Sequence, residues 1–300
     1  MESYHFIFDV DSTHFQTYGH QYGKAFNAHH QAQGFHPLMV FDGMTGDCLK
    51  VELRAGNVYT SRNIVSFIGP LLSHYQKRFP SSYRIVRGDS GFAHKELYKL
   101  CETLNTNYVI RLKANATLYR LAKEVMDVFL EECSLQYSQQ FYGEFEYQAK
   151  SWDRPRRVIV QVRRKAGELI PDYLFLVTNM ETRPEMVISL YAKRGTMENY
   201  IKECKNGFRI DKVSHKHWMT NVNRIQLMVL AYNLINGFRR LTLPHEFSKM
   251  QIETLRIKLI KIAAKRVKQS RRIMFKLCSH HPYKEVFHHC LKTIQAIQLE

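Results

Sequence analysis

The pattern of apolar and polar positions divides the chain into three parts. In residues 1–114, short apolar runs bounded by polar or turn residues alternate with stretches of helical spacing. They predict strands at 5–12, 37–43, 48–54, 83–89 and 108–113, and helices at 61–78 and 95–104. The first three strands form a meander, with a turn around Met44, Thr45 and Gly46. This order is typical of an α/β domain in which one mixed sheet is flanked by helices.

In residues 115–183 the pattern becomes rich in β structure. A helix is predicted near 118–133, and alternating positions then predict strands at 145–152, 156–165 and 173–179. We expect a β-rich insertion that either extends the edge of the sheet or forms a platform of its own.

Residues 184–300 have helical spacing almost throughout. Helices are predicted at about 184–205, 218–240, 245–276 and 283–298. This part is expected to complete the core and to supply a helical C-terminal region.

Composition excludes several classes of protein. The 300 residues are 45% hydrophobic and 12% aromatic, which is enough for a large core and argues against disorder. The longest apolar run, 225–235, is too short for a membrane helix, and the N-terminus lacks the features of a secretory signal. We therefore expect a cytoplasmic protein.

The cysteines and histidines do not predict a zinc site. The six cysteines are scattered without a C-x-x-C pair, so they are expected to be reduced and to fill core space. The histidine pairs at 29–30, 280–281 and 288–289 are adjacent in sequence, and no cysteine lies at ligand spacing from them.

The positive charge is concentrated in one segment. The net charge is +17, and residues 205–276 contain 17 Lys and Arg against three acidic residues. Residues 256–276 contain nine basic residues and no acidic one, whereas an ordinary solvated helix mixes both signs. Binding of a polyanion is the first inference. The candidate contacts are Arg256, Lys258, Lys261, Lys265, Arg266 and Lys268.

One predicted helix carries four chemically unusual residues on a single stripe. Tyr191, Arg194, Glu198 and Lys205 fall within roughly 60° on a helical wheel, beside an apolar seam, and Glu203 falls outside this sector. Ion pairs along a solvated helix would be the simplest interpretation. A functional interpretation requires partners elsewhere in the chain.

Two aspartates supply such partners, because each follows a predicted strand. Asp11 ends the first strand and Asp89 ends the fourth, at positions where α/β sheets place reactive groups. Each has a local alternative, an Asx turn for Asp11 and a turn or helix cap for Asp89. Together with Glu198 they would form a set of carboxylates that repel one another unless a divalent cation neutralises them. Oxygen ligands favour Mg²⁺ or Mn²⁺.

These motifs resemble the DDE transposases of bacterial insertion sequences. The resemblance is carried by DST after the first strand, by RGDSGF, and by the spacing Y-x2-R-x3-E-x6-K at Tyr191, Arg194, Glu198 and Lys205. The phrases GFHPLMVFDGMTGD, ELRAGNV, YVIRLKAN and AYNLI are similar to the insertion sequence 1380 group, and the likeness covers essentially the whole chain. The resemblance implies an RNase H-like fold with a β-rich insertion between the second Asp and the Glu, where residues 115–183 lie.

The resemblance also implies roles for individual residues. Asp11, Asp89 and Glu198 would hold two Mg²⁺ or Mn²⁺ ions for an in-line displacement at phosphorus. Tyr191, Arg194 and Lys205 would grip DNA phosphates near the scissile bond. Asp9 is an alternative to Asp11, because both side chains point to the same side of the strand.

The expected function is that of a transposase catalytic domain, which cleaves insertion-sequence ends and transfers strands to target DNA, as a homodimer in a synaptic complex. The family normally carries an N-terminal DNA-binding region before the first Asp, whereas Met1 lies ten residues before Asp11, so we expect that region to be lacking. The alternatives are an inactive remnant that binds DNA without catalysis and an RNase H-like nuclease without strand transfer.

Overall fold

An eight-stranded mixed sheet organises the molecule. The computed structural model describes residues 5–131 and 136–298. The strands are β1 His5–Ser12, β5 Leu38–Asp42, β6 Cys48–Glu52, β7 Tyr83–Gly88, β8 Asn107–Leu112, β9 Gln139–Tyr147, β10 Arg156–Arg164 and β11 Asp172–Thr178. Their order is β6-β5-β1-β7-β8-β11-β10-β9, with β1, β7 and β8 parallel and the other pairs antiparallel. An antiparallel meander followed by parallel strands is the RNase H-like mixed sheet that was predicted.

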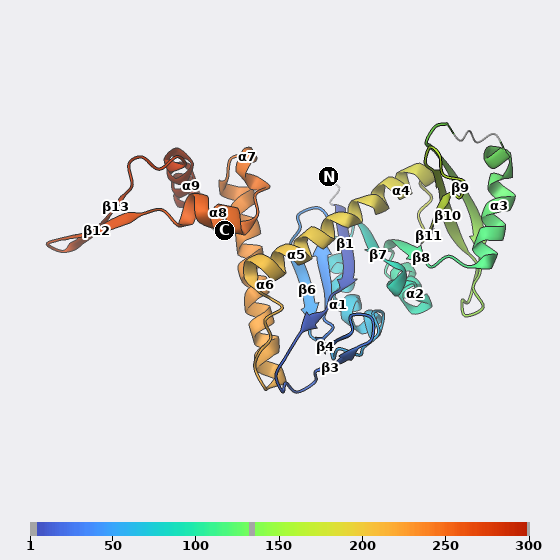
Figure 1. Cartoon of the computed structure of the whole chain (residues 1–300), viewed down its shortest axis with the longest axis horizontal. Helices are drawn as coiled ribbons and strands as arrows, with labels where there is room; N and C mark the ends of the chain where they lie inside the picture. Colours follow the sequence, from blue (N-terminus) through green and yellow to red (C-terminus); the bar gives the residue numbers. More distant parts are fainter. Residues whose placement is uncertain (1–4, 132–135, 299–300) are drawn as a thin grey trace.

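Helices cover both faces of this sheet (Figure 1). On one face lie α1 Ile64–Arg78, α2 Lys95–Thr103 and α3 Ala116–Glu131, whose apolar residues join one buried cluster with the strands. On the other lie α4 Pro184–Ala192, the 3₁₀ turn η2 Lys193–Gly195, α5 Thr196–Phe208 and α6 Trp218–Thr242. Pro184 occupies the first turn of α4, where its missing amide hydrogen has no helical partner to lose. α4, η2 and α5 form a nearly continuous run that crosses the sheet from the insertion to α6 (Figure 1).

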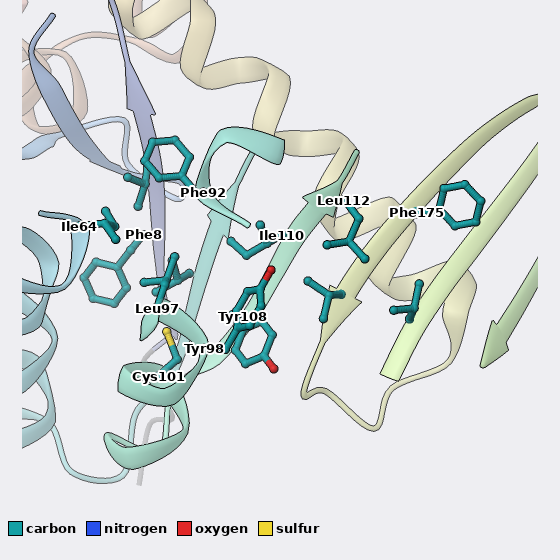
Figure 2. Packing of buried hydrophobic residues seen from close by; sticks show 14 of the residues in the cluster. Phe8, Ile64, Phe92, Leu97, Tyr98, Cys101, Tyr108, Ile110, Leu112 and Phe175 are labelled. Atoms are coloured by element: carbon teal, nitrogen blue, oxygen red, sulfur yellow. The ribbon is translucent and has the colours of Figure 1, made fainter. Parts of the chain in front are cut away.

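The alternation along β1 assigns its residues to the two faces. Phe8 and Val10 pack with α1 and α2, whereas Ile7 packs with α4 in a different cluster. Figure 2 follows the first cluster from Phe8 through Tyr108 to Phe175, which belongs to the insertion. Asp9 and Asp11 therefore share the face covered by α4 and α5.

The insertion extends the edge of the sheet, which was one of the two predicted alternatives. β11 pairs with β8 from Phe175↔Leu112 to Thr178↔Val109. The strand predicted at 145–152 is wrong in position, because β9 spans Gln139–Tyr147 and Trp152 belongs to a turn closed by its amide on Ala149 O. Trp152 is buried against Tyr98 and Tyr147, so it belongs to the core without belonging to a strand. The helix predicted at 118–133 is α3, and its predicted end at Cys133 lies outside the described residues.

The helix predicted at 245–276 is wrong over most of its length. The structure has α7 His245–Ser248, α8 Ile252–Leu255 and the π-helical turn η3 Arg256–Ile260, followed by a hairpin of β12 Ala264–Gln269 and β13 Arg272–Leu277. Apolar residues continue to be buried only as far as Leu259, so the rest of this segment has no core for a helix to pack against. α9 Lys284–Ala296 follows, close to the prediction. A small sheet of β2 Phe15–Gln16, β4 Ala32–Phe35 and β3 Ala25–Asn27 was not predicted.

No helix in residues 5–131 or 136–298 combines the length and apolar character needed to cross a membrane.

Candidate active site

Asp11 and Asp89 lie at the same edge of the sheet, at the ends of neighbouring parallel strands. Val10 of β1 is in register with Gly88 of β7, so the aspartates occupy the next position on each strand. Asp89 also caps the short 3₁₀ turn Ser90–Phe92 through a 2.9 Å hydrogen bond from Gly91 N to its Oδ1. The local alternative for Asp89 is thus present, and it uses one of the two carboxylate oxygens.

The α4–α5 run brings its polar stripe over this edge. Arg194 Nη2 lies 2.9 Å from Asp11 Oδ2, and Ser12 N donates to Asp11 Oδ1 at 2.8 Å. Arg194 is buried, and the Asp11 side chain is 17% exposed, so solvent reaches this ion pair mainly from the side of Asp11. Met197, Ile201, Cys204 and Phe208 of the adjacent seam are buried, as the helical wheel predicted.

The electrostatics of Asp11 indicate which charges lie near it. Burial raises the pKa of Asp11 to about 6, Arg194 opposes this rise, and the negative charges of Asp89 and Glu198 contribute to it. Two acidic groups that are far from Asp11 in sequence therefore lie near enough to destabilise its negative charge. Burial also raises the pKa of Tyr191, so its phenol is neutral at physiological pH and can donate a hydrogen bond.

The other members of the stripe are placed differently. Glu198 lies exposed in the first turn of α5. Lys205 Nζ donates to His14 O at 3.1 Å, three residues beyond Asp11, and lies over the ring of Phe15. Glu203 was predicted to lie off the stripe, and it pairs with Arg239 of α6.

The donors fit a hard divalent cation in their chemistry. Carboxylate oxygens are the ligands that Mg²⁺ and Mn²⁺ prefer, and burial plus repulsion from two carboxylates destabilises the charge of Asp11, which a bound cation would relieve. Among the described residues, no three acidic, histidine or cysteine side chains are close enough to form a ready-made metal site. The fit therefore lies in the kind of donor and not in their present spacing.

Asp9, the alternative to Asp11, is fully engaged in a buried ion pair. Arg87 Nε and Nη2 each lie 2.6 Å from one oxygen of Asp9, and both side chains are 1% exposed. The remaining Arg87 nitrogen, Nη1, donates to Leu190 O of α4 at 2.5 Å. Arg87 was missed from sequence, although a charged residue inside the apolar strand 83–88 signals a buried partner. The pair joins β1, β7 and α4 beneath Asp11.

A cleft of about 1130 Å³ opens from the two aspartates. Its walls include Arg111 and Lys113 of the β8 end, and His29, His30 and His36 from the small sheet and the adjoining loops. Burial lowers the pKa of His30 and His36, so these two imidazoles are neutral at neutral pH. His29 and His30 were identified in the sequence only as unlikely zinc ligands, and His36 was not identified.

The predicted polyanion contacts lie away from this cleft, in the C-terminal segment. Arg256 pairs with Glu253 at 2.6 Å, and Lys258 Nζ lies 4.8 Å from the ring centre of Tyr283. Lys261 is exposed at the end of η3. Lys265, Arg266 and Lys268 are exposed on β12.

Comparison with known proteins identifies relatives of the chain. The family model described as "Transposase DDE domain group 1" matches residues 2–299. No curated protein matches the chain.

Solved structures similar to the chain include two nucleic-acid complexes. A piggyBac transposase synaptic complex with hairpin DNA matches at 14% identity with a TM-score of 0.45, over 77% of this chain and 46% of that chain. Marinitoga piezophila Argonaute, in complex with 5′ OH guide RNA and target DNA, matches at 11% identity with a TM-score of 0.26, over 61% of this chain and 25% of that chain. The chain thus spans less than half the length of the piggyBac chain.

Proposed function

The chain belongs to the transposase DDE domain group 1 family, and from this premise we propose that it cleaves and rejoins DNA strands at the ends of an insertion sequence. The observation that carries the proposal is the position of Asp11 and Asp89 on adjacent strand ends beneath the helical run that bears Glu198. The repulsion that Asp89 and Glu198 exert on Asp11 supports their acting as one group.

We assign Asp11, Asp89 and Glu198 as the residues that would hold two divalent ions, Mg²⁺ or Mn²⁺. When bound, such ions supply Lewis-acid activation of the attacking oxygen and stabilisation of the leaving oxygen. The protein fixes the first carboxylate through Ser12 N and Arg194, and it fixes the second through Gly91 N. The Asp9–Arg87 pair beneath them holds the two strands and α4 in position.

The phosphates next to the scissile bond are proposed to contact Tyr191, Arg194 and Lys205. Tyr191 is neutral and can donate its hydroxyl hydrogen to a phosphate oxygen. Lys205 uses one donor on His14 O, which leaves two of its three ammonium hydrogens for a ligand. Arg111 and Lys113 on the wall of the cleft would attract the strand further from the carboxylates.

We further propose that two copies of the chain associate through α6. Leu227, Leu230, Leu234 and Leu241 are 56–65% exposed and follow one another at spacings of three, four and seven residues, as in the seam of a coiled coil. Leu227, Leu230 and Leu234 lie in the part of α6 between Arg224 and Arg239, which has no charged residue, so two copies of this basic chain can approach there without repulsion. A second copy is therefore the partner that this face fits.

Nicking of supercoiled plasmid in Mn²⁺ tests the catalytic proposal. We expect activity in the unaltered chain and its loss, by at least about a thousandfold, in both Asp89→Ala and Glu198→Ala, because each removes a carboxylate from the group. Glu181→Ala, which removes an exposed acidic residue outside the site, serves as the control. Nicking that survives both active-site substitutions would overturn the proposal.

Two other outcomes would identify the alternatives. DNA binding without nicking by the unaltered chain would favour the non-catalytic remnant. Metal-dependent cleavage without strand transfer, and without preference for insertion-sequence ends, would favour the nuclease.

A further inference from the structure

The hairpin of β12 and β13 is a free-standing ribbon. The two strands pair in continuous register from Ala264↔Leu277 to Gln269↔Arg272, around a turn at Ser270 and Arg271. They form a two-stranded sheet of their own, and the ribbon projects from the end of the molecule opposite the insertion (Figure 1). An isolated two-stranded hairpin is only marginally stable in water, so a ribbon of this kind is expected to have a partner surface.

The charge of the ribbon indicates the class of partner. The ribbon and its turn carry six exposed basic residues: Lys265, Arg266, Lys268, Arg271, Arg272 and Lys276. No acidic residue occurs in the sequence from 254 to 284. Within the described parts of the chain, none of the six basic side chains forms an ion pair with a carboxylate. Such unneutralised charge fits a polyanion.

The cross-strand register distributes the cations over both faces of the ribbon. Arg266 lies opposite Phe275 and Lys268 opposite Ile273 on one face. Lys265 lies opposite Lys276, and Val267 opposite Met274, on the other. A ribbon that binds a membrane surface or an apolar protein groove would have one apolar face. In this ribbon each face combines cations with apolar side chains.

Exposed apolar side chains follow the turn. Ile273 and Phe275 are 59% and 65% exposed, and their side chains lie on the face that also carries Arg266 and Lys268. A DNA groove presents this combination, because phosphates border it on both sides and base edges, including thymine methyl groups, form its floor.

We propose that the β12–β13 ribbon inserts into the major groove of duplex DNA, with its cations on the flanking phosphates and Ile273 and Phe275 against base edges. The strands of a ribbon lie about 4.8 Å apart, and a major groove about 12 Å wide admits a two-stranded ribbon. This deepens the proposed function, on which the choice of DNA as substrate rests. The ribbon lies outside the cleft, so it would hold duplex flanking the cleavage site.

Fluorescence anisotropy with a labelled duplex, without divalent metal, tests the cations over a series of salt concentrations. We expect Arg266→Gln with Lys268→Gln to reduce the slope of log Kd against log salt by about 2, one for each phosphate contact. The matched control, Lys77→Gln with Arg78→Gln, removes the same charge from exposed positions at the end of α1 and should leave the slope unchanged. Equal effects of the two double variants would overturn the proposal, since they would reflect net charge alone.

A second variant tests the base contacts. Ile273→Ala with Phe275→Ala should weaken duplex binding about fivefold or more, the low end of a good base-edge contact, with an unchanged salt slope. Met186→Ala, which truncates an exposed apolar side chain on α4, is the control. Thermal unfolding of each variant checks that the fold is intact, and unaltered affinity in the ribbon variant would contradict base contact.

Groove-specific competitors decide the mode of entry. Methyl green, which occupies the major groove, should displace the protein from duplex, whereas the minor-groove ligand netropsin should not. The reverse result would overturn insertion into the major groove. Because these measurements need no cleavage, the ribbon can fail while nicking persists, and nicking can fail while the ribbon binds.

Discussion

At the scale of single residues, the two aspartates of β1 have different environments despite lying two positions apart. Asp9 uses both oxygens on Arg87 and is closed off from solvent, whereas Asp11 faces the cleft and contacts Arg194. The alternation of residues along the strand could place both aspartates on one face of the sheet. It could not show that their environments differ, because the difference depends on Arg87, 78 positions from Asp9. We therefore propose Asp11 as the metal ligand and Asp9 as a residue that holds β1, β7 and α4 together through Arg87.

Replacing Arg87 by Met should destabilise the fold by about 3–5 kcal/mol, because it leaves the buried carboxylate of Asp9 without a partner. The free energy of unfolding would be measured by urea titration. Arg120→Gln, which breaks the exposed Arg120–Glu124 pair on α3, is the control and should cost less than about 1 kcal/mol. Similar losses in the two variants would show that the Asp9–Arg87 pair has no special structural role.

The raised pKa of Asp11 gives a pH dependence to metal binding. Below pH 6 the carboxyl is increasingly protonated, and a proton competes with the cation, so affinity for Mn²⁺ should fall roughly tenfold per pH unit below that value. Above pH 6 affinity should level off. Titration calorimetry between pH 5 and 7 measures this, and Asp11→Asn should remove the pH-dependent step. Affinity that is constant over this interval in the unaltered chain would contradict it.

At the scale of elements, the strands of the core could be predicted from sequence. Because helices cover both faces of the sheet, each of these strands is a short apolar run. β1 and β7 were predicted almost to the residue. The seam of α5 was also predicted, because Met197 and Ile201 recur at the helical period and are buried. Local pattern was sufficient for these elements, since each one buries the residues that define its period.

Other elements could not be predicted from local pattern. The pairing of β11 with β8 joins residues far apart in the chain, and periodicity carries no information about which strands become neighbours. The ribbon was predicted to be a helix because residues 245–276 have helical spacing, whereas Ile273 and Phe275 face solvent and have no core to pack against. Likewise, the grouping of Asp11, Asp89 and Glu198 was expected from the strand ends, the helical stripe and the resemblance, and it stays a prediction, since neither strand alone specifies the position of α5.

At the scale of the whole molecule, the two proposed binding surfaces are separate. The exposed cations and apolar side chains of the ribbon belong to β12 and β13, whereas the exposed leucines belong to α6. DNA on the ribbon and a second copy of the chain on α6 would therefore not compete for the same surface.

Leu230→Glu combined with Leu234→Glu should prevent self-association through α6. Light scattering after size-exclusion chromatography should report about the monomer mass of 35.5 kDa for this variant and twice that mass for the unaltered chain at micromolar concentration. The dissociation constant should rise roughly a hundredfold or more, because like charges facing one another in an interface cost several kcal/mol. Met186→Glu, on α4, is the control for an added charge at an exposed apolar position. A monomeric unaltered chain would exclude α6 as a self-association face.

The hydrogen-bonded continuity from β8 into β11 has a further consequence for how the molecule denatures. Because the inserted strands extend the same sheet as the carboxylate-bearing strands, and Phe175 packs in the cluster that contains Phe8, separating them would break backbone pairing and expose apolar surface together. Insertion and core should consequently melt as one cooperative unit, so hydrogen exchange at the amides of β8 and β11 would report the same opening event.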